Sequence, residues 1–145
     1  MPTPVCKMIT DIVISGVADF LRSSGRSELA TVNIYERDFG DDLAYPAVIV
    51  ADDGTPEEDA VIRGQWSVPV AVIFRSAPEG DKDAQAHRLI CRTINDLVGD
   101  SEALIEHLGN SMHCNDTLGG QGTTEASDGF RETTFTVEVK AAELS

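Results

Sequence analysis

The sequence predicts an α+β fold: a single domain, residues 1–145, in which a mostly antiparallel sheet of four to five strands carries helices packed on one face. Three observations predict it. The chain has 145 residues, the size of one ordinary domain. Hydrophobic residues make up 41% and charged residues 25%, as in soluble globular proteins. Strand patterns occur in runs separated by helices, which is typical of an antiparallel sheet with segregated helices.

A helix is predicted near the start of the sequence. Thr3 can cap it, Pro4 fits its first position, and Gly25 provides a stop. Gly16 lies inside this helix, where it allows close packing. The apolar residues recur with a helical period at Val5, Ile9, Ile12, Val13, Val17, Phe20 and Leu21.

Two strands are expected next. Residues 29–36 read as the first, with Val32 and Ile34 on one face. Residues 45–51 are apolar without interruption, which predicts a strand buried on both faces. Pro46 should lie at its beginning, because proline cannot donate a ladder hydrogen bond.

The clearest strand is residues 65–74. Its even positions, from Trp66 to Phe74, alternate with polar or smaller residues and should face the core. Pro69 predicts that this strand lies at a sheet edge there or carries a bulge.

The second half of the chain predicts two helices and two strands. Residues 81–98 form a helix that Gly99 ends, and residues 102–108 form a short one. Residues 112–118 are a weak strand candidate, and residues 130–141 alternate as in a strand with one wet face. The apolar face of the longer helix is expected at Ala86, Leu89, Ile90, Ile94, Leu97 and Val98.

Two segments, 52–61 and 117–129, are too long for tight turns, and we expect them to be mobile loops. The first is acidic and the second is rich in glycine. We expect one or both to become ordered against a partner protein or a neighbouring subunit. The candidate interface residues are Asp53, Glu57, Glu58, Asp59, Arg63, Gln121, Glu125 and Asp128.

The charge of the chain excludes several partners. Eleven Lys and Arg against 25 Asp and Glu give a net charge of −14. Such a surface repels phosphate, so neither specific nucleic-acid binding nor an anionic membrane surface is expected. No apolar stretch approaches the roughly 18 residues of a membrane helix, and the start carries no secretory signal. Three cysteines without a CxxC motif suit a reducing compartment, so we expect synthesis in the cytoplasm.

The residues that might carry chemistry form no strong motif. His87 and Cys91 lie four residues apart on one predicted helix face, and Cys6, His113 and Cys114 are the other soft ligands. The spacing of known zinc modules is absent, so we expect surface histidines and buried thiols. The paired carboxylates all fall in loops without a histidine.

The glycine-rich segment 119–122 lacks a following GK[ST] sequence and a following helix, so it is no phosphate loop. We therefore expect no catalytic residue, no metal and no cofactor, and hence no enzyme. Two other classes stay open: a small enzyme that uses a cysteine or a carboxylate, and a monomeric acidic binding module that mimics nucleic acid.

Four stretches carry a resemblance to a known family. They are YPAVIV (45–50), RGQWSVPVAVIF (63–74), DKDAQAHRLICRTINDLV (81–98) and FRETTFTVEVKAAEL (130–144), behind an amphipathic opening helix. In order and layout, over nearly the whole chain, the sequence resembles the tail-terminator (tail-completion, minor tail) proteins of long-tailed bacteriophages. Connector stoppers of the phage neck share the size and composition and remain the alternative.

The resemblance implies a structural virion protein. Such subunits form a homo-oligomeric ring, usually a hexamer, that caps the tail tube, ends its polymerisation and joins it to the head connector protein. It implies no catalysis and no cofactor. The charge is compatible with this role, because carboxylates that face a lumen repel the phosphates of the DNA that passes through it. Ring closure requires one surface patch to meet a different patch.

Overall fold

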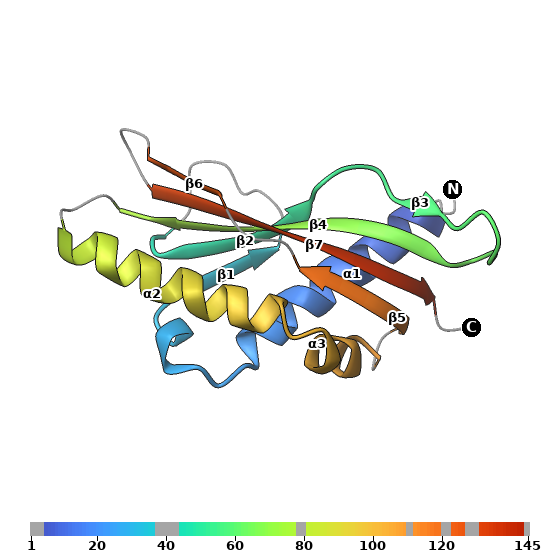
Figure 1. The fold of residues 1–145 in the computed structure, drawn as a ribbon, viewed down its shortest axis with the longest axis horizontal. Helices are drawn as coiled ribbons and strands as arrows, with labels where there is room; N and C mark the ends of the chain where they lie inside the picture. The colour runs from blue at the N-terminus through green and yellow to red at the C-terminus, as the bar shows by residue number, and fades with distance from the viewer. Residues whose placement is uncertain are drawn as a thin grey trace.

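The computed structural model describes residues 5–36, 44–77, 81–109, 112–119, 123–126 and 131–143. Thr3, Pro4, Gln121 and Asp128 lie outside these ranges, as do residues 37–43. The elements, drawn in Figure 1, are α1 (Val5–Arg22), a 3-10 turn η1 (Ser27–Leu29), β1 (Asn33–Glu36), β2 (Ala47–Asp52), β3 (Glu57–Glu58), β4 (Trp66–Ser76), α2 (Asp81–Val98), α3 (Ser101–Leu108), β5 (Met112–Gly119), β6 (Thr123–Ala126) and β7 (Arg131–Glu143).

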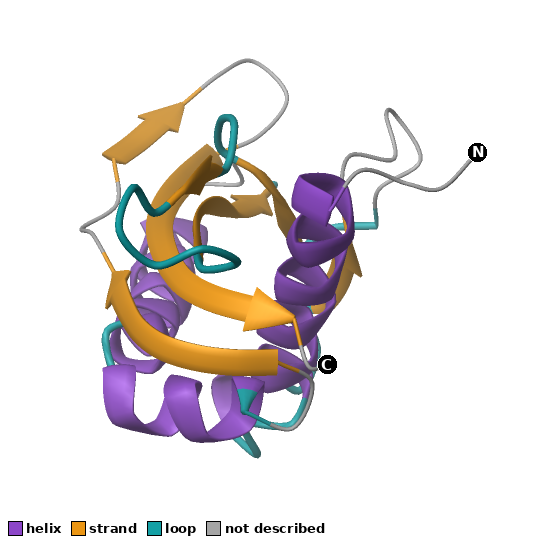
Figure 2. Ribbon diagram, turned by 90° about the vertical axis from the view of Figure 1, so that its right-hand side faces the viewer, coloured by secondary structure: helices purple, strands orange, loops and turns teal. Residues whose placement is uncertain are grey.

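The described strands form one sheet in the order β1-β2-β4-β7-β5, and the short strands β3 and β6 are added to β4 and β7. Only the β1–β2 pair is parallel; the others are antiparallel. The predicted α+β class with a mostly antiparallel sheet is therefore confirmed. Seen end-on in Figure 2, the sheet is strongly curved, and the helices gather along the lower and right-hand sides of the view.

The central pair of strands sets the length of the molecule. β4 and β7 pair continuously from Trp66 opposite Ala141 to Ser76 opposite Arg131. At about 3.3 Å per residue, these ten steps span roughly 33 Å. β3 pairs with the Trp66 end of β4, and β6 pairs with the Arg131 end of β7. β3 and β6, which belong to the two segments that the sequence marks as interface candidates, thus lie at opposite ends of the β4–β7 pair (Figure 1).

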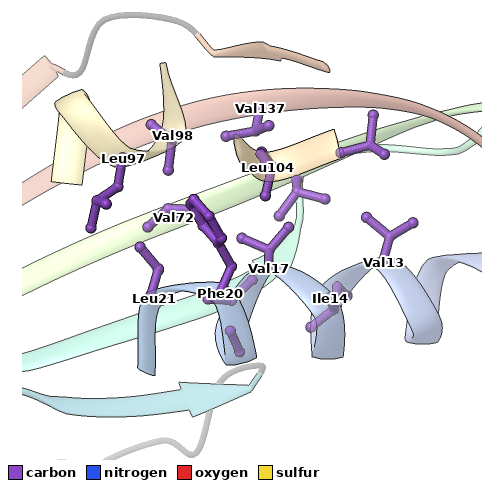
Figure 3. Close-up of a cluster of buried hydrophobic side chains, with 14 of the residues drawn as sticks. Val13, Ile14, Val17, Phe20, Leu21, Val72, Leu97, Val98, Leu104 and Val137 are labelled. Carbon is purple, nitrogen blue, oxygen red and sulfur yellow. The ribbon is translucent and has the colours of Figure 1, made fainter. Parts of the chain in front are cut away.

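The core lies between one sheet face and the three helices. The even residues of β4, from Val68 to Phe74, are fully buried, as predicted, and Trp66 packs partly buried against the same cluster. In Figure 3, Val13, Val17 and Leu21 of α1 point toward the sheet and the other helices, which contribute Val72, Val98, Leu104 and Val137 to the same cluster. Residues 47–50 of β2 are buried on both faces, which confirms that prediction as well.

Gly16 is where α1 meets α3. A Cβ atom at this position would lie 2.5 Å from Cδ2 of Leu108 and 3.5 Å from Cε of Met112. The close packing that the sequence suggested is therefore present, because only a residue without a side chain leaves this space.

Four expectations need correction. Residues 29–36 form a strand only from Asn33, because Leu29 closes the 3-10 turn. The segments 52–61 and 117–129 are not uninterrupted loops: β3 lies in the first, and the end of β5 and all of β6 lie in the second. β4 as a whole lies between β2 and β7, and the local edge predicted at Pro69 is present. Pro69 is accommodated there, because β2 ends beside it and its carbonyl accepts the N–H of Asp53 at 3.1 Å.

The fourth correction concerns α2. Ala86 and Leu89 are exposed, whereas His87 is 3% exposed and belongs to the buried face. The buried face of α2 includes His87, Ile94 and Val98, with the partly buried Cys91 at the same helical spacing. His87, a polar residue with hydrogen-bond partners, therefore faces the core, where the sequence pattern predicted Leu89.

Candidate functional site

The second half of the acidic segment 52–61 forms, together with the residues that follow it, a hairpin that projects from one end of the sheet. We call residues 57–67, which include β3 and the start of β4, the β3–β4 hairpin. Glu57 pairs with Ser67 and Glu58 with Trp66. The turn is closed by Asp59, whose Oδ1 accepts the N–H groups of Val61 at 2.8 Å and Ile62 at 2.9 Å. The conformation is therefore built from local hydrogen bonds.

The tip of this hairpin is apolar and faces solvent. Val61 is 89% exposed and Ile62 is 54% exposed, and Arg63 beside them is also exposed. Gly64 follows with φ of 82°, a left-handed conformation that favours glycine at this point of the turn. Figure 1 shows the hairpin extending beyond the rest of the sheet.

A hollow of about 210 Å³ lies at the base of the hairpin. Glu57, Asp59, Gln65, Ser67 and Lys140 line it, together with Glu58 and Trp66. Glu57, Ser67 and Lys140 occupy one register position on three neighbouring strands. Gln65 is 8% exposed, and its Oε1 has no hydrogen-bond partner among the described residues.

The hollow carries negative charge. The N–H groups of Ile62 and Val61 hold the pKa of the Asp59 carboxyl below its usual value, and the Lys140 ammonium adds to this effect. Asp59 is therefore ionised at neutral pH. With Glu57 and Glu58 it gives three carboxylates within three consecutive residues, against the single ammonium of Lys140.

The structure places the predicted interface residues in two groups. Glu57, Glu58, Asp59 and Arg63 lie on the hairpin, and Asp53 lies where β2 ends beside β4. Glu125 lies on β6 opposite Glu132, at the other end of the sheet. Gln121 and Asp128 lie outside the described residues.

Sequence reasoning missed exposed apolar residues on two separate surfaces, the tip of the hairpin and the outer side of α2. Val61 and Ile62 were not singled out, although a Val-Ile pair inside a polar turn was a visible signal. Leu89 of α2, placed in the core by its spacing, is 52% exposed. It lies between Arg88 and Arg92, which are exposed and pair with no residue that the structure describes.

A second polar group lies under α2, at the end of the sheet away from the hairpin. His87 Nδ1 is 2.6 Å from Ser76 Oγ, and His87 Nε2 is 2.8 Å from Thr133 Oγ1. The imidazole ring also packs on Phe74, with ring centroids 4.6 Å apart. The expectation of a surface histidine is therefore wrong for His87, because the two hydroxyls satisfy its nitrogens inside the protein.

The protonation states of His87 and Cys91 indicate a structural role for this cluster. Burial, and secondly the charge of Arg131, lower the pKa of His87, so the ring is neutral at pH 7. Burial raises the pKa of Cys91, although a hydrogen bond with Thr133 opposes this, so the thiol stays protonated. A protonated thiol and an imidazole held by two hydroxyls make a poor nucleophile and base. The cluster fastens α2 to β4 and β7.

Within the described part of the chain, no three His, Cys, Asp or Glu side chains gather as a metal site would require. Among the described helices, none is long and apolar enough to cross a membrane. Comparison with protein-family models and with curated proteins finds no match to this chain.

Proposed function

We propose that this chain is a structural virion protein of a long-tailed bacteriophage. Its subunits form a ring, a hexamer by resemblance, that caps the tail tube, ends its polymerisation and joins it to the head connector protein. The chain acts by assembly and performs no catalysis. It is made in the host cytoplasm and ends in the virion, at the phage tail or neck.

The observation that carries the proposal is the β3–β4 hairpin. It projects from a long sheet and exposes Val61 and Ile62 beside each other at its tip. Adjacent exposed apolar side chains with a charged rim are typical of a protein contact surface. Ring closure requires the hairpin to contact a different patch on the next copy.

The acidity of the chain supports the same role. Six copies at −14 each carry a formal charge of −84. A lumen of this sign repels the phosphates of passing DNA, so the DNA slides without adhering. The ring thus has no specific nucleic-acid affinity while it surrounds the genome during ejection.

Native mass spectrometry of the purified chain, with negative-stain electron microscopy, tests the proposal. We expect one closed species of six subunits that appears as a ring with a central channel. A chain that stays monomeric both alone and after the tail tube protein is added contradicts the ring, because a ring of this kind can also close on the tube itself. Adding the tail tube protein from the same source separates the two neck roles: a terminator binds the tube end and stops its growth, whereas a connector stopper leaves tube growth unchanged.

A further inference from the structure

The hollow at the base of the hairpin contains two buried polar atoms without a hydrogen-bond partner among the described residues, the acceptor Gln65 Oε1 and the donor Trp66 Nε1, and Lys140 is its one cationic lining residue. Gln65 is more than nine-tenths buried and lines the hollow, and its Oε1 is unpaired among the described residues. A buried amide oxygen without a donor costs free energy. The carboxylates of Glu57 and Asp59 lie on the same hollow and accept hydrogen bonds only. A cationic group with several N–H donors would satisfy both kinds of acceptor.

A guanidinium group fits this requirement better than an ammonium. It presents five N–H donors in a planar fork, so that it can bond a carboxylate and an amide oxygen at once. It also loses less hydration than an ammonium when it enters a partly buried site. The hollow is therefore complementary to an arginine side chain.

The exposed side of α2 carries such side chains. Arg88 and Arg92 are one helical turn apart and lie on the same side of the helix. Neither pairs with a residue that the structure describes. Leu89, which is 52% exposed, lies next to them on the helix. It provides an exposed apolar side chain against which Val61 and Ile62 can pack.

We propose that the β3–β4 hairpin of one copy docks on α2 of the next copy. Val61 and Ile62 pack against Leu89, and Arg88 and Arg92 donate to the carboxylates and to Gln65 in the hollow. The two surfaces lie at different ends of the subunit (Figure 1), so the contact forms between copies and is heterologous. This inference rests on the proposed ring and names the surfaces that close it.

Paired charge reversals test this contact. The hairpin variant is Glu57→Arg with Glu58→Arg, and the α2 variant is Arg88→Glu with Arg92→Glu. All four side chains are exposed, so both variants should fold, which circular dichroism verifies. By native mass spectrometry, each variant alone should fail to form the ring at a concentration where the unaltered chain forms it, with a dissociation constant raised at least tenfold.

Mixing the two variants should restore the ring. The reversed hairpin of one variant meets the reversed α2 of the other, and the unaltered surfaces meet in the next contact. The restored ring should contain both variants in equal number, which their masses reveal. The control for the hairpin variant is Glu102→Arg with Glu106→Arg on α3, which makes the net charge more positive by the same four units at exposed positions and should leave assembly intact.

The outcomes separate the two proposals. A ring that survives either reversal alone, or one that mixing does not restore, overturns the docking of the hairpin on α2 while the ring itself stands. Failure of the unaltered chain to form any ring overturns the proposed function. Loss of the ring in the α3 control shows that net charge controls assembly, which also overturns the specific contact.

Discussion

At the scale of single residues, His87 shows how a polar side chain is kept inside the fold. Both ring nitrogens have hydroxyl partners, Ser76 and Thr133, and these come from two different strands. The ring can be buried because each of its polar atoms keeps a hydrogen bond. The consequence is that α2 is fixed to the sheet at one point, and that protonation of this ring works against folding.

The first prediction is that stability depends on the protonation of His87. Its pKa is lowered in the folded protein, mainly by burial, from the ordinary value of about 6.5. The neutral ring therefore contributes its full stability above pH 6.5. This contribution falls as the pH decreases below 6.5, because the unfolded chain then binds the proton more tightly.

Urea unfolding of the unaltered chain and of His87→Gln, at pH 7.5 and at pH 5.5, measures this effect. Glutamine is neutral at both pH values, so the difference in unfolding free energy between the two proteins should narrow at pH 5.5. A difference that stays constant or widens contradicts the prediction.

The second prediction compares one substitution at two buried threonines. Thr133 is 3% exposed and its hydroxyl bonds His87, so Thr133→Val should lower the unfolding free energy by about 1–3 kcal/mol. Thr117 is also 3% exposed, but its Oγ1 has no partner among the described residues. Thr117→Val removes an unsatisfied group and should leave stability equal or raise it by about 1 kcal/mol. Denaturant titration of both variants checks the sign, and a large loss at residue 117 contradicts the assignment.

At the scale of elements, the contact between α1 and α3 depends on one missing side chain. Gly16 lies against Leu108 and Met112, which are fully buried. Because the atoms around this contact are close-packed, a larger residue must push α1 and α3 apart or force Leu108 out of its rotamer.

The third prediction follows from this contact. Gly16→Val should lower the unfolding free energy by about 1–3 kcal/mol, the usual cost of overpacking a core. The control is Ser15→Val, one residue away on the exposed side of α1, which should change stability by less than about 0.5 kcal/mol. Thermal unfolding of the two variants distinguishes a packing effect from a general effect of valine in a helix. Equal losses in both would contradict the packing argument.

At the scale of the whole molecule, the two ends of the subunit are chemically different. The hairpin end carries carboxylates and an apolar tip. The outer side of α2 carries Arg88 and Arg92, which have no ion-pair partner among the described residues, and the exposed Leu89. A chain with net charge −14 repels its own copies at long range. Assembly therefore requires that its few cations lie where they meet the partner's acids.

The fourth prediction concerns protection of the hairpin on assembly. Amide hydrogen exchange at residues 60–64 should be fast in the monomer, since the tip is exposed, and should slow at least tenfold in the ring. The segment 117–129, the other interface candidate, is followed in the same experiment. Unchanged exchange in both segments would contradict the expectation that these segments order against a neighbour, and the core strand β4 serves as the internal reference.

Much of the fold follows from local pattern. The helical period around Val13 and Val17 predicts α1, and the alternation from Trp66 to Phe74 predicts β4 with the correct face inward. These features could be predicted because each is encoded by residues that are neighbours in the sequence.

What only the tertiary structure decided depends on partners that are distant in the sequence. β3 has two residues, too few for a periodicity, and exists because β4 offers it hydrogen bonds. The rotation of α2 was set by Ser76 and Thr133, which hold His87 inward and leave Leu89 in solvent. The sequence by itself thus determined the helices, the longer strands and the charge of the chain. Long-range hydrogen bonds decided which side chains those elements present to another molecule, because satisfying a buried polar atom requires a partner whose position no local pattern specifies.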